Sequence, residues 1–102
     1  MKFTVEEKSV ELLNELLPLI ARTEMPFPHI TPNDTHGFTL LWDCKHNSNT
    51  LVVYVHEVYE VHIIQEEQRV QKTDEPVLAF STINKSINEL DLRPKSRYGQ
   101  YR

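Results

Sequence analysis

The side chains best suited to chemistry form a polar cluster in the segment His56-Glu57-Val58-Tyr59-Glu60-Val61-His62. Histidine and glutamate bind divalent cations, and a zinc protease would place two histidines four residues apart on one helix face. Here the fourth residue after His56 is Glu60, so that motif is absent. On one continuous strand these two residues would lie about 13 Å apart, too far to share an ion. Only a hairpin turn near Glu57 would make His56, Glu60 and His62 a candidate metal-binding set.

Cys44 is the second candidate, because a thiolate formed beside His46 would be a nucleophile. One strand end supplies neither a group that orients the histidine nor an oxyanion site. The serines lack the Gly-x-Ser-x-Gly frame of a nucleophile elbow. Two glycines in the whole chain exclude a glycine-rich phosphate loop. We therefore interpret Cys44 as inert, and we expect a protein that is not an enzyme and has no cofactor.

Charge divides the chain into two unlike parts. The 102 residues carry 11 basic and 15 acidic side chains, a formal net charge of −4. The last ten residues hold four of the basic groups and no acid, which leaves 7 basic against 15 acidic residues, or −8, over residues 1–92. An acidic domain is steered toward basic surfaces, so we expect a protein partner of basic character. The candidate contacts are acidic or aromatic: Glu57, Tyr59, Glu60, Glu66 and Glu67.

Residues 93–102 form the basic part, which we interpret as a flexible C-terminal tail after a single domain over residues 1–92. Pro94 and Gly99 break any helix, and no apolar periodicity remains. Arginine and lysine could meet phosphate while tyrosine stacks on bases, so a nucleic-acid-associated accessory role is an alternative. Four positive charges would give only weak, salt-sensitive binding. The tail contacts would be Arg93, Lys95, Arg97, Tyr98 and Tyr101.

Apolar spacing predicts a helix at each end of the domain. One stripe with intervals of three and four residues covers residues 5–21, although Pro18 predicts a kink or an early end. A second stripe of the same spacing follows Pro76 and ends before Pro94. The two stripes are Val10, Leu13, Leu17 and Ile20, and Phe80, Ile83, Ile87 and Leu90.

Three segments between the helices predict strands, at residues 38–43, 51–55 and 58–64. A turn near His56 and Glu57 separates the last two, with a bulge in one long strand as the alternative. The proline-bearing residues 24–37 predict an extended segment, and the polar residues 65–75 predict a hairpin end and a connection. The fold class is therefore α+β in the order α-β-β-β-α, with a three-stranded antiparallel sheet packed with two helices.

Both faces of the predicted sheet are apolar. Leu51, Val53 and Val55 share one face, and Val52 and Tyr54 share the other. A sheet that is apolar on both sides needs two covering layers. Either the helices divide between the faces, or the second face meets another chain. The second case leaves a homodimer and a complex with a different protein open.

Residues 26–42 resemble a segment of small uncharacterised bacterial and phage proteins, in which a proline-bearing stretch and a glycine precede a strand ending in Leu-x-Trp. The chain departs from that pattern at His36, where a small residue is usual, and at Leu41, where a polar one is usual. The resemblance implies an α-β-β-β-α fold and an antitoxin-like or phage accessory role, and it implies no catalytic residue. The matching residues are Pro28, Ile30, Pro32, Gly37, Leu40 and Trp42.

Together these patterns predict a non-catalytic protein-binding module, either an antitoxin-type regulator or a phage-encoded inhibitor that occludes its partner. The chain has no run of 18 apolar residues and no apolar leader, so we expect a cytoplasmic protein without a membrane segment. The alternatives are a nucleic-acid-associated accessory protein that uses the tail, and a metal-binding protein that uses histidine and glutamate.

Overall fold

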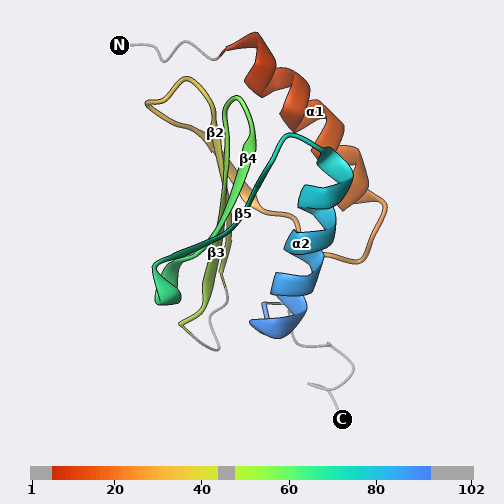
Figure 1. The fold of residues 1–102 in the computed structure, drawn as a ribbon. Coiled ribbons are helices and arrows are strands. Elements are labelled where there is room, and N and C mark those ends of the chain that lie inside the picture. The colour runs from red at the N-terminus through yellow and green to blue at the C-terminus, as the bar shows by residue number, and fades with distance from the viewer. Residues whose placement is uncertain (1–5, 44–47, 93–102) are drawn as a thin grey trace.

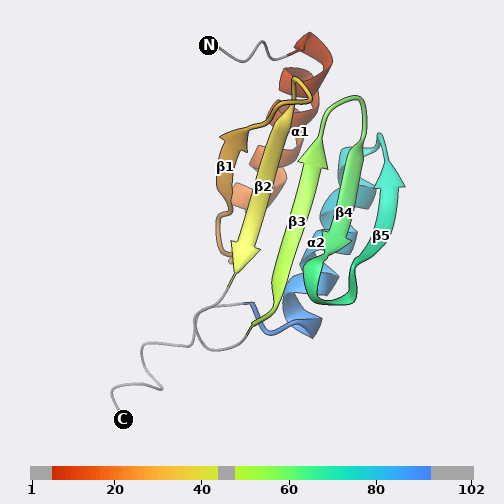
Figure 2. The ribbon, with the colours of Figure 1, turned by 90° about the vertical axis from the view of Figure 1, so that its left-hand side faces the viewer.

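A computed structural model describes residues 6–43 and 48–92. Every strand of its sheet pairs antiparallel with its neighbour in sequence, in the order β1-β2-β3-β4-β5 (Figure 2). The helices are α1 (Glu7–Ala21) and α2 (Pro76–Glu89). The strands are β1 (His29–Pro32), β2 (Phe38–Asp43), β3 (Thr50–Val55), β4 (Tyr59–Ile63) and β5 (Gln68–Thr73), and a short 3-10 helix (Ile64–Glu66) joins the last two.

The α+β class, the two helices and the antiparallel sheet are confirmed, but the sheet has five strands, so the prediction of three is wrong. Strand β5 lies in the polar segment that we predicted to be a connection. It is an edge strand, and a mostly exposed edge lacks the apolar alternation that marks a half-buried strand. Strand β1 lies in the proline-bearing segment. Pro32 is tolerated there because an edge strand leaves some amides without a ladder partner.

Both helices cover the same face of the sheet, and within residues 6–43 and 48–92 no element covers the other face (Figure 1). Cross-strand neighbours such as Leu40, Val53 and Val61 point toward the helices and are fully buried. Ile20 of α1 and Ile83 of α2 belong to the same core. The helices therefore do not divide between the two faces, and the sheet has one covering layer.

Helix α1 turns apolar side chains inward and acidic side chains outward. Leu12, Leu16 and Ile20 are buried at intervals of four residues, whereas the outward stripe of Glu7, Glu11 and Glu15 is exposed. The helix continues past Pro18 to Ala21. The proline removes one backbone hydrogen bond, while the burial of Ile20 in the following turn contributes roughly 1.5–3 kcal/mol.

The beginning of α1 is attached to two strand turns at one end of the sheet. The Glu6 amide donates to the His36 carbonyl at 2.8 Å, and the buried Ser9 hydroxyl donates to the His56 carbonyl at 2.9 Å. Gly37 packs against β3 so closely that a Cβ atom would lie 2.0 Å from the Val55 carbonyl oxygen. Only glycine fits that approach. The turns β1–β2 and β3–β4 are therefore fixed relative to each other and to the helix.

Among the described residues, no helix is long and apolar enough to cross a membrane.

Candidate functional site

The uncovered face of the sheet carries two rows of cross-strand neighbours. Partner residues of an antiparallel sheet share a face, and successive residues alternate between faces, so the register assigns each row. The first row is Thr39, Tyr54, Glu60 and Lys72, and the second is Leu41, Val52, His62 and Arg69. Val52 is only 5% exposed and Tyr54 is 39% exposed. The face therefore has an apolar centre with polar side chains toward β5.

The polar side chains of this face contact one another around Glu60. Its Oε1 atom lies 3.4 Å from His62 Nε2 and 3.9 Å from Arg69 Nη1. The His62 ring also meets the Tyr54 ring edge-on, with centroids 5.0 Å apart and planes at 74°. Exposed ion pairs contribute little to stability, with a median of about 0–1 kcal/mol. His62 therefore links the Glu60 carboxylate to the Tyr54 ring at the surface.

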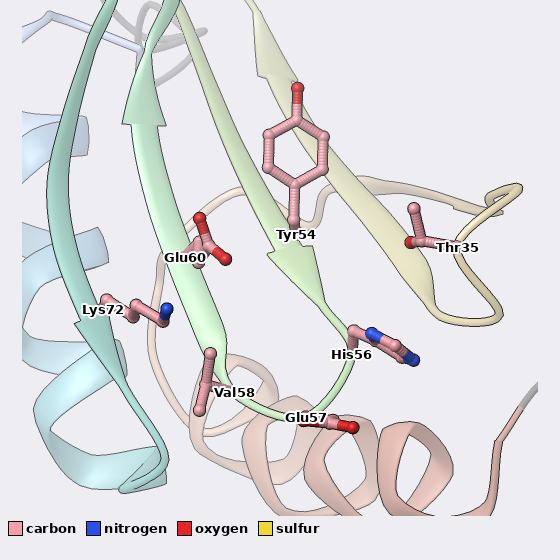
Figure 3. Close-up of a pocket in the computed structure, with 7 residues that line it drawn as sticks. All are labelled: Thr35, Tyr54, His56, Glu57, Val58, Glu60 and Lys72. Carbon is pink, nitrogen blue, oxygen red and sulfur yellow. The ribbon is translucent and has the colours of Figure 1, made fainter.

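A pocket of about 470 Å³ lies where this face reaches the β3–β4 turn (Figure 3). The Tyr54 ring, the Glu57 and Glu60 carboxylates and the Lys72 ammonium line it, together with Thr35, His56 and Val58. Its volume is in the range of sites that receive one small molecule or one large side chain. Two carboxylates against one ammonium give it a formal charge of −1 with histidine neutral, which favours a cationic occupant.

The edges of the sheet are protected against the addition of another strand. Strand β1 carries Pro32, and Pro28 precedes it. On the opposite edge the β4–β5 ladder shifts register between Val61 and His62, and Arg69 and Lys72 place charges on β5. Prolines, bulges and charges are the usual devices that prevent edge-to-edge pairing. A partner would therefore meet the face of the sheet more readily than its edges.

The predicted protein-contact residues do not form one surface. Glu57 lies in the β3–β4 turn and Glu60 on the uncovered face, and both line the pocket. Glu66 and Glu67 are exposed, but Glu66 ends the 3-10 helix that follows β4 and Glu67 comes directly after it, at the opposite end of β4 from Glu57. The structure therefore brings Glu57 and Glu60 together at the pocket. Glu66 and Glu67 lie apart from them.

Tyr59 does not belong to any contact surface. It is 0% exposed, and its hydroxyl donates to the Leu12 carbonyl inside the core. Burial raises the pKa of this hydroxyl above the ordinary value of 10.0, and the Glu15 carboxylate raises it further. The prediction of Tyr59 as a contact is wrong because Tyr59 pairs with Val55, which places it on the covered face.

The predicted metal-binding set does not assemble. Glu60 and His62 are neighbours on β4, but His56 lies in the turn. The turn instead places His56 beside Glu57 and Glu6, and ligand atoms of these three residues all lie within 4.8 Å of one another. Within residues 6–43 and 48–92, this is the one group of histidine, cysteine or acidic side chains close enough to hold an ion.

The remaining predicted residues lie outside the part of the chain that the structure describes. They are the tail contacts Arg93, Lys95, Arg97, Tyr98 and Tyr101, and the pair Cys44 and His46.

Sequence reasoning missed four residues of the site: Glu6, Lys72, Arg69 and Tyr54. Tyr54 had a signal, since its alternation with Val53 and Val55 places it on the second sheet face. Lys72 and Arg69 had none, because their strand was not recognised. The approach of Glu6 to His56 joins residues 50 positions apart, which no local pattern reports.

Comparison of the chain with protein-family models, with curated proteins and with solved structures found no match. The evidence on function is therefore that of the molecule itself.

Proposed function

We propose that this chain is a non-catalytic protein-binding module that uses the uncovered face of its sheet. The observation that carries the proposal is the single covering layer: both helices pack on one face, and no described element covers the other (Figure 1). That second face exposes Tyr54 and part of Leu41 around the buried Val52. Tyrosine is enriched among residues that dominate binding energies. An apolar centre with a polar rim is also the usual anatomy of a protein interface.

Charge favours a basic protein over a second copy of the chain as the partner. Residues 1–92 hold all 15 acidic side chains and seven basic ones, a formal charge of −8. Two copies that each carry a formal net charge of −4 repel one another at long range. A partner with a basic surface gains attraction from the same charges.

The pocket beside Tyr54 suits a basic side chain of that partner. A guanidinium placed against the Tyr54 ring gains a cation–π contact, and the Glu57 and Glu60 carboxylates offer charge-assisted hydrogen bonds. Lys72 neutralises part of this charge, so the pocket suits one cation. Binding of this kind would occlude a functional surface of the partner, as an antitoxin-type regulator or a phage-encoded inhibitor does.

Photo-cross-linking from two exposed positions tests the proposal. A benzophenone amino acid at Tyr54 samples the uncovered face, and the same group at Val77, which is 67% exposed on α2, samples the helical layer. We expect irradiation in lysate of the source cells to give a discrete adduct with one other protein from position 54. Position 77 should not give that adduct, and added salt should reduce it because the attraction is electrostatic.

Mass spectrometry of the adduct decides the outcome. An adduct between two copies of this chain would replace the proposed partner with a homodimer. The same adduct from both positions, or none from position 54, would contradict a binding face. Glu60→Gln is the matched variant, since it removes one pocket charge with little change in shape and should weaken the adduct with a basic partner.

A further inference from the structure

The start of α1 and the β3–β4 turn bring three metal-binding side chains together outside the face described above. Glu6 stands just before the helix, and His56 and Glu57 are neighbours in the turn. Each offers one ligand atom, and these atoms lie within 4.8 Å of one another. The set combines one imidazole nitrogen with two carboxylate oxygens.

The His56 ring nitrogen has the environment of a ligand atom. Nε2 is inaccessible to solvent and has no hydrogen-bond partner among the described residues, although Glu6 Oε2 lies 3.2 Å away. Two ligands bound to one ion with bonds of about 2.1 Å lie roughly 3.0–3.4 Å apart. The observed separation of the two atoms is already of this size. The His56 side chain as a whole is 35% exposed, and Nε2 faces Glu6 Oε2, so an ion between the two atoms would replace this contact with two ligand bonds.

The backbones that carry these ligands are held in place by hydrogen bonds of their own. The Glu6 amide donates to the His36 carbonyl at 2.8 Å, and the His56 amide donates to the Val58 carbonyl at 3.1 Å. The Ser9 hydroxyl fixes the His56 carbonyl at 2.9 Å. Only side-chain rotations of Glu6 and Glu57 are needed to close the set around an ion. Both carboxylates are exposed and free to make that rotation.

We propose that Glu6, His56 and Glu57 form a binding site for a divalent transition-metal ion. Imidazole nitrogen suits zinc, and carboxylate oxygen is shared by zinc and manganese. A dication neutralises the two carboxylates, so the occupied site carries no net charge. His56 and Glu57 also line the pocket, so the metal site lies beside it (Figure 3). The site goes beyond the proposed protein binding, because Glu6 and the His56 ring have no part in that binding, although Glu57 belongs to both sites.

Bound metal would connect the helix to the turn directly. Anything that binds the folded state and not the unfolded one raises thermal stability by mass action. The Tm of the protein should therefore rise with metal concentration, and this rise should need all three ligands.

Calorimetric titration of the full chain tests the site. The protein is stripped with a chelator and titrated with zinc chloride and, separately, with manganese chloride at neutral pH. We expect one saturable site per chain in the wild type. The affinity should fall about tenfold or more in His56→Ala, in Glu6→Gln and in Glu57→Gln. The rise in Tm with zinc should disappear in the same variants.

Glu66→Gln and His29→Ala are the matched controls, because they change the same residue types at exposed positions outside both the cluster and the pocket. Both should bind metal as the wild type does. If His56→Ala does not fold in chelator, by circular dichroism, the exposed Glu6→Gln and Glu57→Gln variants decide. Absence of saturable binding, or binding that survives all three cluster variants, would overturn the proposal.

Discussion

The two faces of the sheet use similar residues for opposite purposes. Tyr59 on the covered face is 0% exposed, and its hydroxyl is satisfied by the Leu12 carbonyl. Tyr54 on the other face is 39% exposed, and its ring meets the edge of the His62 ring. These tyrosines are five residues apart, on the two strands of one hairpin. Residue type alone therefore says little about role, and the turn between the strands decides it.

The turn decides because it sets which residues are partners. Val55 pairs with Tyr59, so three residues form the turn, and Tyr54 pairs with Glu60. Paired residues share a face of the sheet. Val55 and Tyr59 therefore both lie on the covered face, and Tyr54 and Glu60 both lie on the uncovered face. The covered face supplies stability through burial. The uncovered face keeps its side chains available for contact with another molecule.

The strongest way to test this comparison is to truncate both tyrosines. Tyr59→Ala should lower the free energy of unfolding by about 3–5 kcal/mol, because it opens a cavity and removes the partner of a buried carbonyl. Tyr54→Ala should lower it by about 1 kcal/mol or less. Urea unfolding measures both. An equal loss in the two variants would show that the Tyr54 face is also covered in solution.

A smaller effect is expected at the attachment of α1 to the turns. Ser9→Ala removes a buried hydroxyl that donates to the His56 carbonyl, so we expect a loss of about 1–3 kcal/mol in the free energy of unfolding. Ser81→Ala is the matched control, since Ser81 is exposed on α2 and should change stability by about 0.5 kcal/mol or less. Similar losses in both variants would mean that the Ser9 contact contributes nothing specific.

The smallest effect, absent at neutral pH, concerns the ionisation of Tyr59. Its pKa is raised in the folded protein, so the folded state keeps its proton above the pH at which the unfolded chain loses it. The stability from this group is complete below pH 10.0 and falls as the pH rises further.

Urea titrations at several alkaline pH values measure that fall. Tyr59→Phe should start from a lower stability, because the hydrogen bond to Leu12 is gone, but it should lose less with rising pH than the wild type. Tyr54→Phe is the control and should follow the wild-type slope. If Tyr59→Phe also follows that slope, the buried hydroxyl does not couple to unfolding.

The sequence predicted the parts of the fold that contribute a regular apolar pattern to the core. The stripe through Ile83 and Ile87 marked α2, and the alternation of Leu51, Val53 and Val55 marked β3. Strand β5 was not predicted, because its side chains contribute little to the core. Its inward positions hold Gln71 and Thr73, and its outward ones hold lysine and arginine. A strand made only by hydrogen bonds to a neighbour leaves no periodic trace in the sequence.

The candidate site shows the same limit more sharply. The polar cluster at residues 56–62 was visible as a source of chemistry, and the turn near His56 was correctly expected. The sequence did not show which residues the turn would separate. A shift of the turn by one residue moves every following side chain to the other face of the sheet. Glu6 could be placed only by the packing of α1 against the turns, which depends on Ser9 and on the absence of a side chain at Gly37.

The strictly sequential order of the strands has a consequence for how the chain folds during synthesis. Each hairpin joins segments close in sequence, so the sheet can grow by short loop closures as the chain emerges. Helix α1 leaves the ribosome before the sheet does, yet its anchor at His56 is 47 residues away from Ser9. The apolar stripe of α1 cannot be buried until the sheet has been synthesised. Until then it is exposed to chaperones and prone to aggregation.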